Sequence, residues 1–290
     1  ASNNTAVGGL ALLDNTTGHS NASVGLSALE NNTTGCFNVA MGVCALYTNT
    51  TAIRNTAIGT HALCLNTTGA ENVAVGALSL DANTTGDNNV AVGQSALTAN
   101  TTANDNTAVG YLSLTTNTTG AINAAFGGYA LQDNTTGASN TAVGISSLEN
   151  NTTASENTAV GYRSLYTNTT GTRNVAVGFG AMLCNTSGND NTAVGRCTMK
   201  LNTTGTDNTA MAKDALVFNT TGSNNTAIGK SALYTNTTAG DNTAMGSEAL
   251  KLNTTGSRNT SVGRNALEAN TTGGNNTAMG TNALLLNTTA

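Results

Sequence analysis

Apolar and polar residues recur along this chain with a fixed period of 17 residues. The phrase Asn-Thr-Ala-Val-Gly marks the period, and its glycine falls at Gly8, Gly25, Gly42 and every seventeenth position up to Gly280, except at Ala212. Seventeen repeats and one further residue account for all 290 residues without an insertion or deletion. A short fixed period is typical of a solenoid, because each repeat buries its apolar face only against its neighbours.

We number the positions of the repeat as slots 1 to 17, with Ala1 in slot 1. Slot 7 is apolar in every repeat, and slot 12 is leucine except at Met182 and Met199, so we expect slots 7 and 12 to form the core. Slot 6 is alanine or serine, and slot 11 is alanine, serine or threonine. Such small residues predict the close approach of another backbone.

The alternation of side chains predicts two short strands in each repeat. Slots 4 to 7 form the first strand, with slots 5 and 7 on the same face, and slots 10 to 13 form the second, with slot 12 facing inward. Slots 10 and 13 vary widely and are therefore expected on the outer surface. The glycines of slots 8 and 1 predict corners, where backbone with positive φ or tight clearance is needed.

Helix and disorder are the two competing interpretations of a chain rich in Ala, Leu, Asn, Thr and Gly. Helix is disfavoured because the glycine, asparagines and threonines of each repeat have low helix propensity, and no 3.6-residue stripe continues through the corners. Disorder is disfavoured because disordered tracts do not keep apolar residues in strict register. The absence of proline fits strands in which each N–H pairs with a neighbouring coil.

The predicted fold class is therefore all-β: a parallel β-roll or β-solenoid of 17 coils, each of 17 residues, in one repeat domain spanning residues 1–290. Neither end has an atypical polar capping repeat, although exposed end coils are aggregation-prone edges. We therefore expect the chain to be a segment of a longer fibre or to join end to end with other copies.

Asparagine occupies slots 4 and 15 in every repeat. Amides stacked from coil to coil can each donate and accept a hydrogen bond along the axis, so both slots predict structural ladders. In the first seven repeats the slot 4 ladder comprises Asn4, Asn21, Asn38, Asn55, Asn72, Asn89 and Asn106. The slot 15 ladder there comprises Asn15, Asn32, Asn49, Asn66, Asn83, Asn100 and Asn117.

Slot 15 also begins a formal N-glycosylation sequon, Asn-x-Thr or Asn-x-Ser, in every repeat. A single row of glycans would be anchored only ~4.8 Å apart, whereas stacked amides need that spacing, so we expect a ladder with sparse or no glycan. The possible acceptors are Asn15, Asn32, Asn49, Asn66, Asn83, Asn100, Asn117, Asn134, Asn151, Asn168, Asn185, Asn202, Asn219, Asn236, Asn253, Asn270 and Asn287.

Composition excludes several classes of partner. The net charge is −5, and only 9% of residues are charged, which argues against a nucleic-acid partner. No apolar run approaches the ~18 residues that a membrane span needs, so we expect no membrane span.

The chain offers no recognisable catalytic or metal-binding motif. The two histidines and the acidic residues lie scattered in variable slots, which predicts no catalytic residue and no enzyme activity. The five cysteines form no CxxC pair, so neither a disulfide framework nor a thiolate metal site is indicated, and most are expected to be surface thiols. No cofactor site is expected.

The segments at residues 106–120 and 242–256, which read NTAVGxxxL or NTAMGxxAL followed by NTTG, resemble the head repeats of YadA-like trimeric autotransporter adhesins and related repeats of bacterial and phage tail-fibre proteins. The similarity extends over the whole chain. It implies a left-handed parallel β-roll, three chains side by side, small residues facing the trimer axis, and Val and Leu filling each roll. Adhesin head repeats are usually shorter than 17 residues, so the repeat length departs from the family pattern.

We therefore expect a structural and adhesive fibre segment, extracellular, at the cell surface or in a virion tail fibre. Its partners would be copies of itself, in a homotrimer or an end-to-end filament, and a host or cell-surface receptor. One alternative is an ice-binding solenoid, although the adjacent Thr16 and Thr17 point in opposite directions and slot 15 is asparagine where an outward Thr-x-Thr array needs threonine. Another is a glycan-coated filament. A carbohydrate lyase ranks last, for want of an acidic or basic cluster.

Overall fold

The computed structural model describes residues 1–289, and within that range it contains strands and turns but no helix. The chain divides into two compact units, Ala1–Ile145 and Ser146–Ala290, and the division falls inside the ninth repeat. Each unit is a β-solenoid in which one 17-residue repeat makes one coil. Each coil contributes one three-residue strand at slots 5 to 7.

The strands of the first unit are β1 (Thr5–Val7), β2 (Ala22–Val24), β3 (Val39–Met41), β4 (Thr56–Ile58), β5 (Val73–Val75), β6 (Val90–Val92), β7 (Thr107–Val109), β8 (Ala124–Phe126) and β9 (Thr141–Val143). Those of the second unit are β10 (Thr158–Val160), β11 (Val175–Val177), β12 (Thr192–Val194), β13 (Thr209–Met211), β14 (Thr226–Ile228), β15 (Thr243–Met245), β16 (Thr260–Val262) and β17 (Thr277–Met279).

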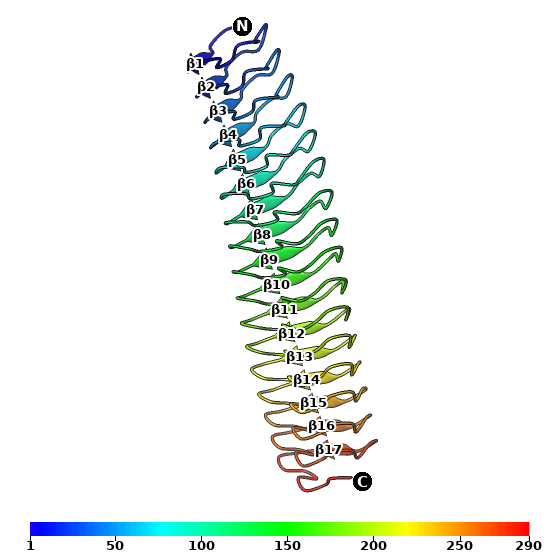
Figure 1. Ribbon diagram of the computed structural model, residues 1–290. Coiled ribbons are helices and arrows are strands. Elements are labelled where there is room, and N and C mark those ends of the chain that lie inside the picture. The colour runs from blue at the N-terminus through cyan, green and yellow to red at the C-terminus, as the bar shows by residue number, and fades with distance from the viewer. Residues whose placement is uncertain (290) are drawn as a thin grey trace. The chain divides into compact units, whose positions relative to one another are not determined.

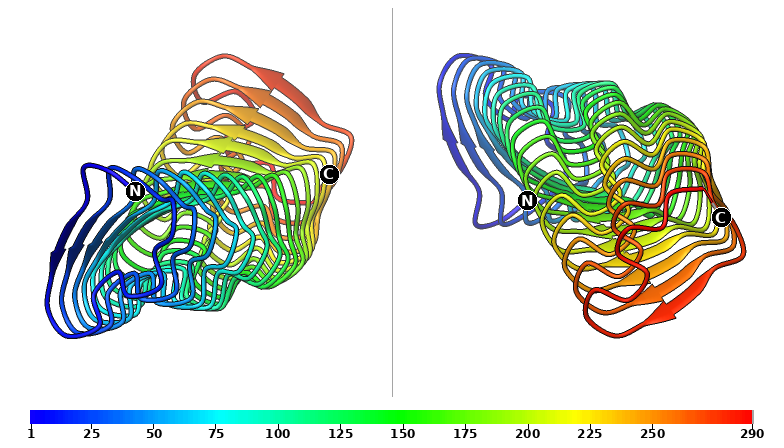
Figure 2. Two further views of the ribbon diagram at one scale, coloured as in Figure 1. Left: turned by 90° about the horizontal axis from the view of Figure 1, so that it is seen from above. Right: turned by 90° about the horizontal axis from the view of Figure 1, so that it is seen from below.

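Within each unit, consecutive strands pair in parallel and lie side by side (Figure 1). In each pair of strands, a strand residue pairs with the residue 17 positions later, as Val7 does with Val24 and Val160 with Val177. Seen along the stack, the coils of a unit form similar closed outlines with the strand on one side (Figure 2). The prediction of an all-β parallel β-solenoid with one coil per repeat is confirmed. Its handedness and the association of three chains stay predictions.

Glycine ends the strand at slot 8. These glycines have φ between +120° and +142°, and a Cβ on Gly110 would lie 2.5 Å from the backbone carbon of Gly127 in the next coil. Both the conformation and the clearance therefore favour glycine, as the sequence predicts. Ala212, the one exception, has φ +97°.

The prediction that slot 7 fills the core is wrong. The strands turn slot 6 inward, and Ala40, Ala108 and the other described slot 6 residues from the second coil onward are buried, whereas slot 7 faces outward and Phe126 is 42% exposed. The small slot 6 residues therefore face the interior of their own coil and not a trimer axis. The coil is too narrow for Val or Met at this position, because the interior also holds the slot 12 leucine and two asparagines.

The predicted second strand is also wrong, although slot 12 does face inward. Slots 10 to 13 form a turn in which slots 10 and 12 have positive φ, as at His61 (+57°) and Leu63 (+54°). The left-handed conformation interrupts the alternation of a strand, so the adjacent Ala62 and Leu63 both point inward and are fully buried. The backbone still pairs with the next coil here, since Leu63 N–H donates to the carbonyl of Ser79 at 3.0 Å.

The core of each unit is therefore a set of columns along the stack. Small residues of slots 6 and 11, the leucine or methionine of slot 12 and the asparagines of slots 4 and 15 form these columns. Slot 1 closes the coil tightly, because a Cβ on Gly35 would lie 2.4 Å from both the Ala52 carbonyl oxygen and Asn32 Oδ1. The described residues include no helix with the length and apolar character that a membrane crossing needs.

Candidate functional site

The asparagines of slot 15 form a ladder of side-chain hydrogen bonds within each unit. Asn32 Nδ2 donates to Asn15 Oδ1 at 2.9 Å and to the carbonyl of Gly35 at 3.1 Å, and the same pair of bonds recurs at Asn100, which donates to Asn83 Oδ1 and the Ala103 carbonyl at 3.1 Å each. Each amide-to-amide bond in the ladder runs from a later coil to the preceding one, whereas the bond to the slot 1 carbonyl runs to the following coil. The ladder therefore fixes the register of the turn, one coil at a time.

The asparagines of slot 4 join backbone to side chain. Asn38 backbone N–H donates to Asn21 Oδ1 at 2.9 Å, and Asn38 Nδ2 donates to the carbonyl of Ala52 at 2.9 Å. Both ladders meet at slot 1, since the Gly35 carbonyl accepts from Asn21 Nδ2 at 2.8 Å and Asn32 Nδ2 at 3.1 Å. The two invariant asparagines of one coil thus hold the first residue of the next.

The slot 15 side chains are inaccessible in the interior of each unit. Asn32, Asn100 and Asn270 are fully buried, whereas Asn15 and Asn287 in the end coils are partly exposed. Because Asn32 Nδ2 already makes two hydrogen bonds, a sugar on this nitrogen would have to displace one of them and find space in a packed interior.

The outward face of the sheet is a regular, mainly apolar surface in each unit. Slot 7 presents Val, Ile, Met or Phe in every strand, and slot 5, partly buried beside it, presents Thr, Val or Ala. Phe126 and Met245 are each 42% exposed. A continuous apolar column of this length is unusual on the surface of a soluble monomer and is typical of an interaction face.

The threonines of slots 16 and 17 differ in environment. Thr33 Oγ1 donates to the carbonyl of Thr50 at 3.0 Å, and this bond recurs in most coils, whereas Thr34 and its equivalents in slot 17 are exposed. Slot 16 therefore supports the stack, and slot 17 forms an exposed column of hydroxyls in each unit.

The variable slots hold side chains that interact along the stack. Arg173 donates two hydrogen bonds to Asp190 in slot 3 of the next coil, 2.6 and 2.9 Å long, and the guanidinium lowers the pKa of that carboxyl. Tyr162 stacks on Phe179 with ring centroids 5.5 Å apart, and the Arg163 guanidinium lies 5.3 Å from the Tyr162 ring centroid. These groups are exposed, so each contributes little to stability.

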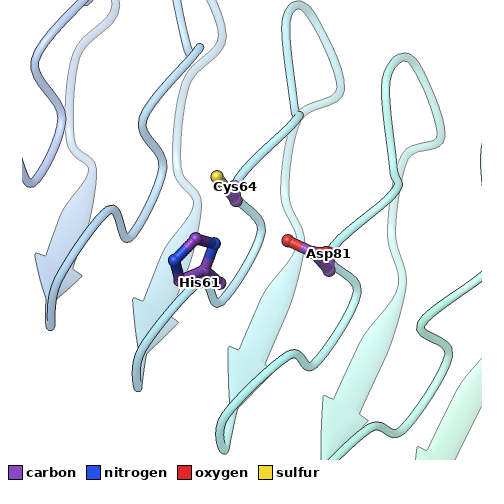
Figure 3. A group of neighbouring side chains, drawn as sticks. All are labelled: His61, Cys64 and Asp81. Atoms are coloured by element: carbon purple, nitrogen blue, oxygen red, sulfur yellow. The ribbon is translucent and has the colours of Figure 1, made fainter.

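One cluster of metal-binding side chains interrupts this surface. His61 in slot 10 and Cys64 in slot 13 belong to the turn after β4, and Asp81 occupies slot 13 of the following coil, after β5. One donor atom from each residue lies within 4.8 Å of the others. Figure 3 shows the imidazole and the thiol in one turn and the carboxylate reaching toward them from the next.

The cluster is electrostatically unusual. Cys64 is only 7% exposed, and burial, with smaller effects from Asp81 and Cys44, raises the pKa of its thiol to about 11. Burial also raises the pKa of Asp81, which His61 partly offsets. Oδ1 of Asp81 is buried and accepts no hydrogen bond from the described residues. A buried carboxylate oxygen without a donor costs free energy, so this atom needs an explanation.

These three residues are separated in the chain and match no known motif, so the sequence alone predicts no role for them. The repeat does contain the signal. Residues 17 apart stack directly, so Asp81 lies one coil above Cys64, and His61 precedes Cys64 by three residues in a tight turn. Four of the five cysteines are partly exposed, as expected of most of them, while Cys64 is buried, and all five are free thiols.

No protein-family model matches this chain, and no curated protein matches it significantly.

Proposed function

We propose that this chain is a structural, non-catalytic segment of an extracellular fibre, at a cell surface or in a virion tail, and that copies associate through the outward sheet face. The observation that supports this proposal is the column of slot 7 side chains, which are apolar in all 17 strands and point away from the core. A fibre segment of this kind needs no catalytic group in any of its repeats.

The area of this face suits association. A three-residue strand is about 10 Å long and neighbouring strands are about 4.8 Å apart, so each coil offers about 50 Å². The nine strands of the first unit offer about 430 Å² and the eight strands of the second about 380 Å², which adds to about the 800 Å² that one partner buries in a standard interface. A second copy is the fitting partner, because only an equally periodic surface matches the strand spacing along the column of each unit.

A side-by-side homotrimer, as the adhesin-like repeats imply, places three slot 7 columns around one axis. This arrangement replaces the initial expectation that slot 6 faces the axis. The variable slots then lie outside, where they are free to contact a receptor. End-to-end joining is compatible with it and would be head to tail, because each slot 15 amide donates to the slot 15 amide of the preceding coil.

Lysines in slot 7 test association without disturbing the core. A double variant, Val75→Lys with Val92→Lys, should fold normally, since both side chains point outward, but should weaken association at least about tenfold by placing like charges in a desolvated face. The matched control places lysines in slot 9 of the same coils, Ala77→Lys with Gln94→Lys, where both residues are exposed. Analytical ultracentrifugation would measure the association of each variant, and circular dichroism would show whether each variant is folded. A monomeric wild-type chain, or equal effects in the two variants, would contradict the proposal.

Ice binding is the second candidate, supported by the same face in the second unit. Seven of its eight strands begin with threonine in slot 5, so a column of Thr-x-aliphatic pairs repeats at the strand spacing. This array differs from the Thr16 and Thr17 array of the sequence analysis. Thermal hysteresis of the wild-type chain that is abolished by Thr209→Lys and Thr226→Lys would favour ice binding, and its absence would leave the fibre proposal.

A further inference from the structure

The His61, Cys64 and Asp81 donors come together because two neighbouring coils present the same outer turn. Slot 13 stacks Asp81 on Cys64, and slot 10 brings the His61 imidazole from the same turn as Cys64. The three donor atoms lie within 4.8 Å of one another. No other group of three or more His, Cys, Asp or Glu side chains with this geometry occurs in the described part of the chain.

We propose that His61, Cys64 and Asp81 bind one Zn²⁺ ion, which joins the fourth and fifth coils. One imidazole nitrogen, one thiolate and one carboxylate oxygen form a donor set that suits zinc, whereas calcium and magnesium prefer oxygen ligands alone. Three protein ligands leave the fourth tetrahedral position for water. This site is independent of the proposed fibre function, because it lies in the turn and not on the sheet face.

The geometry needs only a small adjustment. Zinc lies about 2.0 to 2.3 Å from nitrogen, oxygen and sulfur ligands, so donors in a tetrahedral site are roughly 3.3 to 3.8 Å apart. The present donors must close by about 1 Å, which rotation of the three side chains can supply. Metal entry is open, because neither His61 nor Asp81 is buried.

The unpartnered oxygen of Asp81 is the independent observation that supports a ligand here. Oδ1 of Asp81 is buried without a hydrogen-bond donor, although nearly all other buried side-chain polar atoms among the described residues are bonded. A cation between Asp81 and Cys64 would satisfy this oxygen and the thiolate together. Metal binding would then stabilise the folded chain, since the unfolded chain does not hold the three donors in place.

The repeat supplies variants that should fold. Slot 10 is serine at Ser95, and slot 13 is threonine at Thr98, so His61→Ser and Cys64→Thr each introduce a residue that the same slot already accommodates. Asp81→Gln is matched in the same way by Gln132. These substitutions remove one ligand each without a new packing problem.

Cobalt and zinc titrations of the reduced, chelator-treated chain test the site. We expect one Co²⁺ per chain, with a thiolate-to-cobalt charge-transfer band that Zn²⁺ abolishes, and a melting temperature that rises with Zn²⁺ concentration. Each of the three variants should lower the zinc affinity at least about tenfold, and Cys64→Thr should abolish the charge-transfer band.

The control removes the other neighbouring histidine and cysteine. His19→Ser with Cys36→Ser changes two slot 2 residues to the serine found there at Ser155, and it should leave the zinc affinity and the cobalt spectrum unchanged. A wild-type chain without the charge-transfer band would overturn the proposal. So would binding that persists in Cys64→Thr or that disappears in the control.

Discussion

Slots 3, 10 and 12 of every coil have positive φ, and nearly all of these residues have a side chain. An L-residue in this conformation costs roughly 1–2 kcal/mol. At slot 12 the burial of a leucine offsets that cost, since a fully buried leucine contributes about 1.5–3 kcal/mol. At slot 3, which is exposed in almost every coil, no comparable burial offsets it.

Ile122 therefore offers a stabilising substitution. It is β-branched, has φ +60° in slot 3 and is 62% exposed, so the strain is not offset by packing. Ile122→Asn should raise the free energy of unfolding by about 1 kcal/mol, because asparagine tolerates positive φ, as it does at Asn88 in the same slot. Urea denaturation would measure the change. Ile145→Asn is the control, since Ile145 is 55% exposed without positive φ, and an equal gain there would refute the strain argument.

Two features of single residues explain which predictions from the sequence succeed. The glycine of slot 8, replaced only at Ala212, and the leucine or methionine of slot 12 identify the corner and one core column correctly, because their chemistry permits few alternatives. The phase of the strand could not be read in the same way. A period of two places either Val7 or Ala6 inside, and a shift by one residue exchanges the faces. Size alone favours Val7 for the core, whereas the strand side of the coil admits only small residues, such as those of slot 6.

The turn at slots 10 to 13 could not be predicted from the sequence, whereas the metal-binding cluster could. Leu63 has positive φ, which a leucine side chain normally disfavours, so nothing in the sequence indicates a turn and slots 10 to 13 read as a strand. The His61, Cys64 and Asp81 cluster, in contrast, follows from the 17-residue grid once the stacking of equal slots is known. Only the unpartnered Asp81 oxygen required the structure.

At the scale of the strand and its corner, Ala212 is the one position in slot 8 where a Cβ replaces glycine. Its φ of +97° departs from the +120° to +142° of the glycines, so the coil has adjusted to the side chain. Ala212→Gly should stabilise the chain by about 1 kcal/mol. The reverse change, Gly110→Ala, should destabilise it by about 2 kcal/mol, because the new Cβ would meet the backbone of the next coil 2.5 Å away. Thermal denaturation would compare the melting temperatures of the two variants. If both substitutions raised the melting temperature, or both lowered it, this explanation would be wrong.

The slot 15 ladder is the second structural element that can be tested. Asn100→Ala removes the acceptor for Asn117 Nδ2 and the donor for Asn83 Oδ1, both buried, and should lower the free energy of unfolding by about 3 kcal/mol. The same change at Asn15 should cost less than about 1 kcal/mol, because water can reach that partly exposed coil. Equal losses in denaturant titrations would show that the ladder contributes nothing beyond the local turn.

At the scale of the whole chain, the interior slots and the outward sheet face have different roles. The interior slots are nearly constant, so each coil can stack on the next in the same register. The outward sheet face is also nearly constant in its apolar character, although it contributes nothing to the interior of the coil. A surface that is kept apolar in every strand is expected where equal strands of another copy pack against it.

The seventeen slot 15 sequons lead to a prediction about covalent modification. Glycans on slot 15 would be anchored about 4.8 Å apart within a unit, and each would break one of the two hydrogen bonds that an interior Asn Nδ2 makes. Modification before folding would therefore prevent the coil from closing, and modification after folding has no access to buried amides such as Asn100. Only Asn15 and Asn287, in the end coils, are partly exposed.

We accordingly expect the slot 15 asparagines to remain almost free of glycan when the chain is expressed in a glycosylating host. Glycopeptide mapping should find sugar on no slot 15 asparagine other than Asn15 and Asn287. The sequons outside this slot, such as those at the exposed Asn3, Asn224 and Asn275, are counted separately. Treatment with an N-glycanase should leave the melting temperature unchanged. Sugar on most of the seventeen slot 15 sequons would mean that the slot 15 side chains point outward, and the filament would then be coated with glycan.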